Sequence, residues 1–219
     1  MNVTRAKAAT GCENDVMRSN PAHASSDPDV VRQLVRENPW GILVSATSGA
    51  IVASHCPILL EEDAPGLQIA THVGKPDDEI HELGEREMLL IVQGHHGYIS
   101  PSWYAAGATR APTWNYSVAH CYGTPELLDD EENLAVLTRL VERFERRVEE
   151  PLLLDPDYGA RLARGTVGIR LPITRFLCKV KLSQDKDPVS QRQILAALRT
   201  PGPYRNPALA DDMEQRVGL

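Results

Sequence analysis

Residues 94–104 combine several side chains that could bind a flat and negatively charged molecule. The segment holds glycines, hydroxyl groups, two histidines and aromatic rings, and we expect it to form one turn between two strands. Glycine lets backbone N–H groups approach phosphate or ring oxygens, hydroxyl groups donate hydrogen bonds, and aromatic rings stack on planar molecules. An equally weighted alternative is a tight turn whose rings belong to the core. The candidate binding residues here are His96, Ser100, Ser102 and Trp103.

Two further segments carry compatible chemistry. Thr113, Trp114 and Asn115 open the next predicted strand with hydrogen-bonding and stacking groups, although a tryptophan taken alone is more often a core residue. Lys181, Ser183 and Gln184 follow a later strand. Cationic and amide donors at a strand end could bind a phosphate or a propionate, and a solvated strand end explains them equally well.

The histidines are weaker candidates for ligand binding than these three segments. His55 and His72 lie in neighbouring predicted strands, where a lone histidine is usually a polar residue with satisfied hydrogen bonds. His95 and His96 are adjacent, so their side chains should point in different directions and cannot form a simple metal site with two histidines. We nevertheless retain His55 and His72 as candidate cofactor ligands.

The elements that must position these residues are mostly short strands. Asp27 and Pro28 begin a helix that Asn38 and Pro39 end. Alternation and β-branched residues predict strands at 40–47, 50–60, 67–73, 88–93, 113–122, 166–171 and 175–181. Helices are predicted at 76–83, 133–148, 190–199 and 207–217. Strands without regular βαβ alternation favour an antiparallel barrel or an α+β sheet.

Composition narrows the class of protein. The 219 residues fit one domain, and we expect residues 1–20 to form a flexible extension before a single domain at 21–219. A net charge of -7 makes direct DNA binding unlikely, because nucleic-acid affinity depends on clustered cations. No apolar run is long enough for a membrane span, and four widely spaced cysteines indicate a cytoplasmic protein with free thiols. Phosphate-loop, nucleophile-elbow and zinc-helix motifs are all missing from the sequence.

Three segments together resemble the PaiB family, which is described as FMN-binding negative transcriptional regulators. The similarity rests on residues 94–104, on Pro-Thr-Trp-Asn-Tyr at 112–116 and on Lys-Leu-Ser-Gln at 181–184, and it spans about residues 20–207. The resemblance implies an α+β fold, an antiparallel split β-barrel with flanking helices. It also implies a homodimer with FMN at the subunit interface. His95 stands where the family pattern has proline, which adds a possible donor beside His96.

Two of these segments, Pro-Thr-Trp-Asn at 112–115 and Lys-Leu-Ser-Gln at 181–184, are similar to those of piperazate synthases, haem enzymes that form a nitrogen–nitrogen bond in an N-hydroxylated amine. Haem b is therefore the alternative cofactor, and its axial ligand would be His72, with His55 as second choice. Residues 97–104 look closer to PaiB proteins than to piperazate synthases, and this likeness favours FMN. Two functions follow as hypotheses: a PaiB-like FMN protein that regulates transcription indirectly or acts as a flavin-dependent redox protein on a small molecule, or a haem-dependent enzyme.

Overall fold

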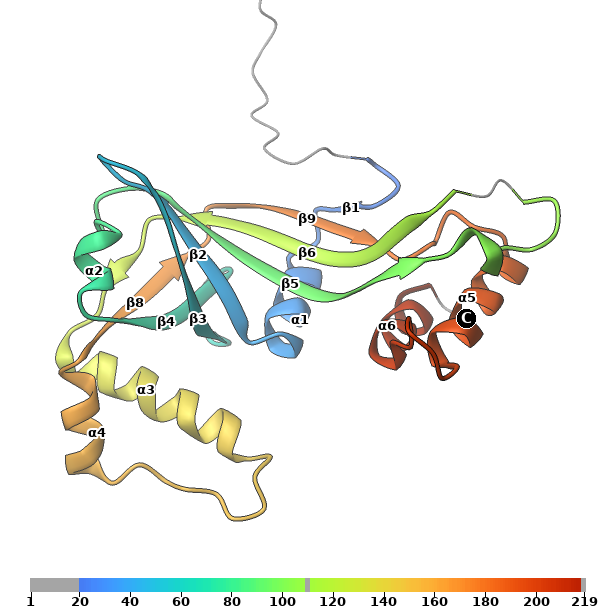
Figure 1. Ribbon diagram of the computed structural model, residues 1–219. Coiled ribbons are helices and arrows are strands. Elements are labelled where there is room, and N and C mark those ends of the chain that lie inside the picture. Colours follow the sequence, from blue (N-terminus) through green and yellow to red (C-terminus); the bar gives the residue numbers. More distant parts are fainter. Residues whose placement is uncertain (1–19, 109–110, 218–219) are drawn as a thin grey trace, which may run out of the picture.

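The computed structural model describes residues 20–108 and 111–217, and its central element is a curled antiparallel sheet (Figure 1). Nine strands of the described chain follow the order β1-β9-β6-β5-β2-β3-β4-β8-β7, and every neighbouring pair is antiparallel. Their bounds are β1 Ala24–Ser25, β2 Trp40–Ala46, β3 Ile51–Leu60, β4 Gln68–Gly74, β5 Met88–Ile99, β6 Thr113–Gly123, β7 Glu126–Leu127, β8 Thr166–Pro172 and β9 Arg175–Lys181. The predicted fold class, an antiparallel split barrel with flanking helices, is confirmed.

Helices flank this sheet, and α1, α3, α4 and α5 begin at side-chain caps. Asp27 accepts a hydrogen bond from the backbone of Asp29, and Asp129 forms a capping box with Glu132. The helices are α1 Pro28–Glu37, α2 Asp77–Ile80, α3 Asp130–Glu145, α4 Pro156–Ala163, α5 Pro188–Arg199 and α6 Pro207–Val217, with a 3₁₀ turn at Pro101–Trp103. Among the described helices, none is both long and apolar enough to cross a bilayer.

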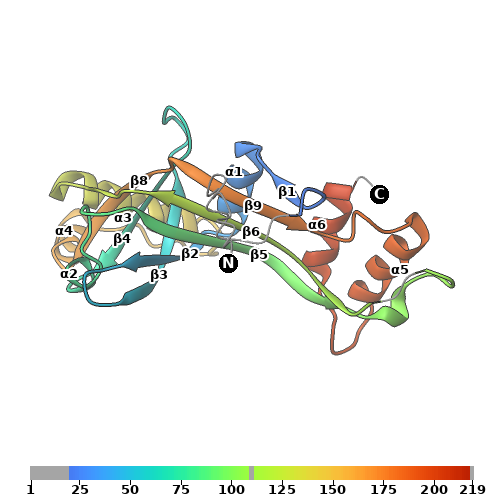
Figure 2. The ribbon, with the colours of Figure 1, turned by 90° about the horizontal axis from the view of Figure 1, so that it is seen from above.

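The helices cover different parts of the sheet. The apolar side of α1, with Val31, Leu34 and Val35, packs on the inner face of the curl. On the outer face, α3 packs against β3 and β4. At the far end, α5 and α6 lie next to the extended tips of β5 and β6 (Figure 2), and their side chains form a second core there.

The outer face of β2, β5, β6 and β9 keeps many apolar side chains partly exposed. Directly opposite residues of antiparallel strands project to the same face. One such row crosses five strands, and all its members are at least partly exposed. The row comprises His55, Ile42, Ile91, His120 and Leu177. Trp40 and Trp114, on the same face, are 57% and 54% exposed.

The predicted turn at residues 94–104 is wrong. Strand β5 continues to Ile99, and only the segment from Ser100 onward turns, through the 3₁₀ helix. The pairing of β5 with β6 shifts between Gln93 and His96, which marks a β-bulge. A bulge breaks strict alternation, so the alternating sequence pattern ends at Gln93 although the strand continues to Ile99.

Close packing explains the glycines of this segment better than a phosphate loop does. A Cβ atom at Gly94 would lie 2.8 Å from Leu34 Cδ1, and one at Gly97 would lie 2.9 Å from Leu209 Cδ2. The two glycines therefore let α1 and α6 pack directly on β5.

Several other helices and strands also differ from the sequence-based prediction. The structure adds β1, β7 and α4, which the sequence pattern did not indicate, and α2 is shorter than the predicted helix at 76–83. The remaining helices and strands lie within a few residues of their predicted ranges. The predicted flexible extension, residues 1–20, lies outside the described residues except for Asn20.

Three cysteines are buried and free: Cys56, Cys121 and Cys178. Burial raises the pKa of the Cys121 thiol to about 12 and that of Cys178 to about 11. Because the thiolate is the reactive form, these side chains act as small core residues, as expected. Cys12 lies outside the described residues.

Buried histidines should make the fold acid-sensitive. Burial lowers the pKa of His72, His81 and His120. The unfolded chain therefore binds more protons at and below its ordinary histidine pKa of about 6.5. We expect the free energy of unfolding, measured with urea, to fall as the pH is lowered from about 7 to about 5. His81, hydrogen-bonded to Ser45 and Ser54, should contribute, so His81→Gln should reduce the slope. A stability that does not change over this range would contradict the prediction.

Candidate cofactor site

A shallow pocket of about 370 Å³ lies on the outer face of the sheet. It is formed by adjacent strands β5 and β6 and lined by Gln93, His96, Trp114, Tyr116 and Val118. Its lining is mostly apolar and aromatic, with an amide and an imidazole at one side. Such a surface suits the face of a planar heterocycle.

Trp114 provides the largest exposed ring of this pocket. The His96 ring lies stacked beside it at a centroid distance of 6.4 Å, and Tyr98 meets its edge at 6.2 Å. With 54% of Trp114 exposed, the expectation that a lone tryptophan belongs to the core is wrong here. The ring is held from one side and is accessible from the other.

The β-bulge orients the two adjacent histidines. Because β5 has one additional residue between Gln93 and His96, both of these side chains reach the outer face. The Gln93 amide contacts His96 Nδ1 at 2.9 Å. His95 turns away toward α6, where its Nδ1 lies 3.0 Å from a carboxylate oxygen of Asp212. The sequence-based expectation that the two histidines point in different directions is confirmed.

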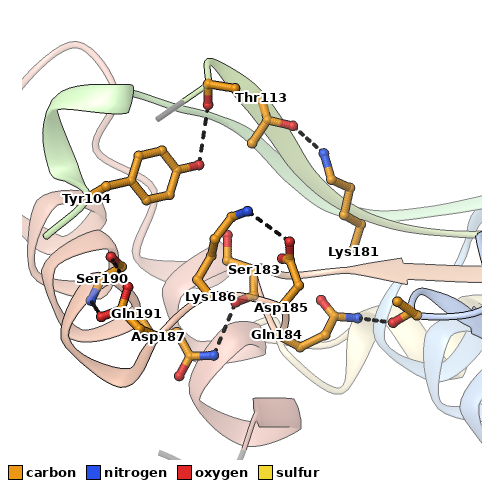
Figure 3. A network of polar contacts seen from close by, with 12 residues as sticks. Tyr104, Thr113, Lys181, Ser183, Gln184, Asp185, Lys186, Asp187, Ser190 and Gln191 are labelled. Carbon is orange, nitrogen blue, oxygen red and sulfur yellow. Dashed lines mark hydrogen bonds and ion pairs between the residues drawn. The ribbon is translucent and has the colours of Figure 1, made fainter. Parts of the chain in front are cut away.

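Lys181 places a cation beside the pocket. It lies opposite Tyr116 in the β6–β9 pair, so both residues start on the outer face. Its ammonium group donates a hydrogen bond to Thr113 Oγ1 (Figure 3). Partial burial lowers the pKa of Lys181. A second cation, the ammonium of Lys179, lies 5.5 Å from the centroid of the Tyr116 ring.

Three predicted binding residues use their polar groups within the protein. Asn115 is fully buried and exchanges hydrogen bonds with Ser183, with a donor–acceptor distance of 2.9 Å from its amide nitrogen to Ser183 Oγ. Ser183 has a positive φ of 62°, which this contact helps to hold. The Gln184 amide donates to backbone oxygens of Val180 and Ala22, so it fastens the end of β9. These residues shape the backbone that supports Lys181.

Ser100, Ser102 and Trp103 lie farther along the same arm. The two hydroxyl groups are 2.8 Å apart, and Ser100 caps the 3₁₀ turn. Trp103 packs on the α5–α6 core and meets the edge of Tyr204 at 6.2 Å. Tyr204 in turn lies 5.2 Å from Tyr98, so a continuous run of rings joins Trp103 to the pocket.

His55 and His72 lie apart from this pocket within one subunit. His55 is exposed on β3, and His72 is half-buried on β4 with no hydrogen-bond partner for its Nδ1. Strands β3, β2 and β5 separate β4 from β6. At a spacing of ~4.8 Å per strand, this is about 19 Å along the sheet. The structure therefore divides the predicted site residues into two groups.

Sequence patterns missed part of the pocket lining. The alternating pattern of β6 placed Tyr116 and Val118 on the same face as Trp114, but only Trp114 was named as a binding residue. Gln93 follows Ile91 on the outer face by simple alternation and was not singled out from the sequence, whereas His96 reaches that face only because of the bulge. Among the described residues, no cluster of three or more His, Cys, Asp or Glu is arranged to hold a metal ion.

The fold is that of known split-barrel flavoproteins. The flavocytochrome Anf3 from Azotobacter vinelandii superposes with a TM-score of 0.60 and 18% identity, over 76% of this chain and 74% of that one. An FAD and haem binding protein from Mycobacterium smegmatis gives a TM-score of 0.55 at 16% identity, over 73% of each chain. These similarities establish the class as the split barrel.

Sequence comparison identifies the family within that class. The family described as "Putative FMN-binding domain" matches residues 17–175. "Protease synthase and sporulation protein PAI 2" of Bacillus subtilis is 27% identical over 197 residues, covering 88% of this chain and 94% of that protein. An uncharacterized protein of Emericella nidulans is 25% identical over 240 residues, covering 89% and 95% of the two chains. The chain belongs to this family of FMN-binding domains, and the resemblance to PaiB proteins is confirmed.

Proposed function

We propose that this protein binds FMN in the pocket beside Trp114, on a sheet face that a second subunit covers. The observation that carries the proposal is the exposed aromatic pocket on the outer face, bordered by cations, in a chain of the FMN-binding family. Trp114 and Tyr116 offer surfaces for the flavin ring. Lys181 and Lys179 would balance the charge of the phosphate.

The chain's own residues would bind and orient the cofactor. The amide of Gln93 and the imidazole of His96 are the polar groups at the pocket that could hydrogen-bond to ring oxygens or nitrogens. Bound FMN would supply electron transfer to or from a small molecule, while the protein provides position and polarity.

A homodimer would complete the site. The outer face exposes apolar residues across four adjacent strands, and a closed two-fold dimer would remove them from water. A second copy would also cover the pocket, which is open in one subunit. The predicted homodimer thus remains part of the proposal.

Two uses of a bound flavin are compatible with this arrangement: turnover of a small substrate, and sensing that changes the contacts of a regulatory partner. The negative charge of the chain favours an indirect effect on transcription over direct DNA binding. We favour a redox protein, because bound FMN would itself supply electron transfer.

The phosphate assignment can be tested with two ligands. Lys181→Gln should weaken FMN binding about tenfold or more, since one charge-assisted contact is worth about 1.5–3 kcal/mol. Riboflavin has the same ring system without the phosphate, so its affinity should change little. Fluorescence titration of both ligands measures the difference. Lys75→Gln, which removes an exposed charge at the end of β4, is the control. Equal losses for FMN and riboflavin would reject the role of Lys181.

One observation supports haem b as the second candidate cofactor. Burial lowers the pKa of His72, which keeps its imidazole neutral, and its Nδ1 has no partner in the described structure. Neutral imidazole is a common axial ligand of haem iron. In that case, the protein would belong functionally with haem-dependent enzymes that act on N-hydroxylated amines.

A further inference from the structure

Four arginines gather in a second pocket that shares no residue with the proposed flavin site. Arg36 comes from the last turn of α1, Arg143 from the last turn of α3, and Arg146 and Arg147 follow the end of α3. The pocket has a volume of about 250 Å³, and Phe144 and Glu37 also line it. We call it the arginine pocket.

The positive charge of the arginine pocket is only partly neutralised. Arg36 forms two hydrogen bonds with the carboxylate of Glu62, at 2.8 and 2.6 Å. Arg143 donates to the backbone oxygen of Arg36 at 2.5 Å, which joins the two helices without adding negative charge. Within the described part of the chain, the side chains of Arg146 and Arg147 have no hydrogen bond or ion pair. Glu37 accepts a hydrogen bond from Gln33 and contributes one negative charge to the lining.

A cluster of four arginines is unusual in an acidic protein. The chain carries a net charge of -7, yet three arginines of this pocket have no carboxylate partner among the described residues. Burial lowers the pKa of Arg143, and the neighbouring charges of Arg147 and Arg146 lower it further against the opposing effect of Glu62. The C-terminal dipole of α3 relieves part of this repulsion. An anion between the guanidinium groups would relieve more.

The geometry points to a diphosphate group as the ligand: we propose that the arginine pocket binds a small molecule carrying two linked phosphates. Guanidinium groups recognise phosphate through paired N–H donors, and several phosphate oxygens can be shared by several arginines. Phe144 is 44% exposed at the same pocket. Its ring could stack on a nucleobase, so a nucleoside diphosphate is one source of this chemistry and inorganic pyrophosphate is the other.

Isothermal titration of FMN-saturated protein with pyrophosphate and with ADP tests this proposal. Prior saturation with FMN keeps the flavin site from taking up the probe. The test variant is Arg146→Gln combined with Arg147→Gln. Both residues are exposed and form no side-chain hydrogen bond or ion pair with the described part of the chain, so the fold and the flavin spectrum should be retained. We expect at least one probe to bind saturably to the wild-type protein, about tenfold or more weakly to the variant, and more weakly as salt increases.

The matched control combines Arg164→Gln and Arg192→Gln, which removes the same charge from exposed positions outside the pocket. This control should bind the probe like the wild type. Tighter binding of ADP than of pyrophosphate, lost in Phe144→Ala, would identify the nucleotide as the source. Equal affinities would identify the diphosphate alone. An absence of saturable binding to the wild-type protein, or equal weakening in both double variants, would overturn the proposal. A failure of FMN binding would be seen separately in the flavin spectrum.

Discussion

Ile91→Asp should convert the protein from a dimer into a monomer and release most of its FMN. Ile91 lies in the middle of the outer-face row between Ile42 and His120. In a two-fold dimer each substitution occurs twice, and each would place a carboxylate in an apolar interface. Burying an unpaired charge costs several kcal/mol, so the dimer dissociation constant should rise by about a hundredfold or more. Sedimentation equilibrium over a range of protein concentrations measures this change.

The control for this prediction is Leu152→Asp. Leu152 is 70% exposed in the segment between α3 and α4, away from the outer face of the central strands. It should leave both the dimer and FMN binding unchanged. Ile91 is only half-buried in one subunit, so its variant should still fold. A folded Ile91→Asp variant that remains dimeric with the wild-type affinity would refute this assignment of the interface.

Trp114→Ala should cause the largest loss of flavin affinity among substitutions in the pocket itself. The exposed indole is the main flat surface available to the flavin, with His96 and Tyr98 supporting it. Stacking of a base on an aromatic side chain is worth about 1–3 kcal/mol, so the dissociation constant for FMN should rise by about fivefold or more. Unlike Lys181→Gln, this change should weaken FMN and riboflavin equally, because it affects the ring system. Quenching of flavin fluorescence provides the measurement.

Trp114→Phe provides the matched control. A phenyl ring retains much of the stacking surface, so this variant should recover most of the affinity lost in Trp114→Ala. An alanine variant that binds FMN like the wild type would place the flavin elsewhere on the sheet.

The sequence predicted elements whose signals are local. Asp27 and Pro28 correctly marked the start of α1, and alternation correctly predicted β6. It also predicted which residues share one face of β6. Alternation alone did not show which of the two faces would be covered. In the structure α1 packs on one face, and no described helix packs over the pocket on the other. Trp114 was therefore identified as a candidate without its exposure being known.

Contacts between distant residues explain what the sequence could not predict. Gly94 and Gly97 resemble loop glycines locally, and their packing partners, Leu34 and Leu209, come from helices at opposite ends of the chain. Asn115 likewise meets Ser183 across 68 residues. The Pro-Thr-Trp-Asn-Tyr motif that contains Asn115 could be identified from the sequence, but the burial of Asn115 against Ser183 could not.

An absorption spectrum of the purified protein, reconstituted separately with FMN and with haem, tests the central proposal most directly. FMN binding should give the flavin bands in the blue and near ultraviolet, and these should remain with the protein after gel filtration and be lost from Trp114→Ala. A single intense Soret band that is retained instead, and that shifts in His72→Ala, would contradict the FMN assignment and favour the haem-dependent alternative. Retention of neither cofactor would contradict both.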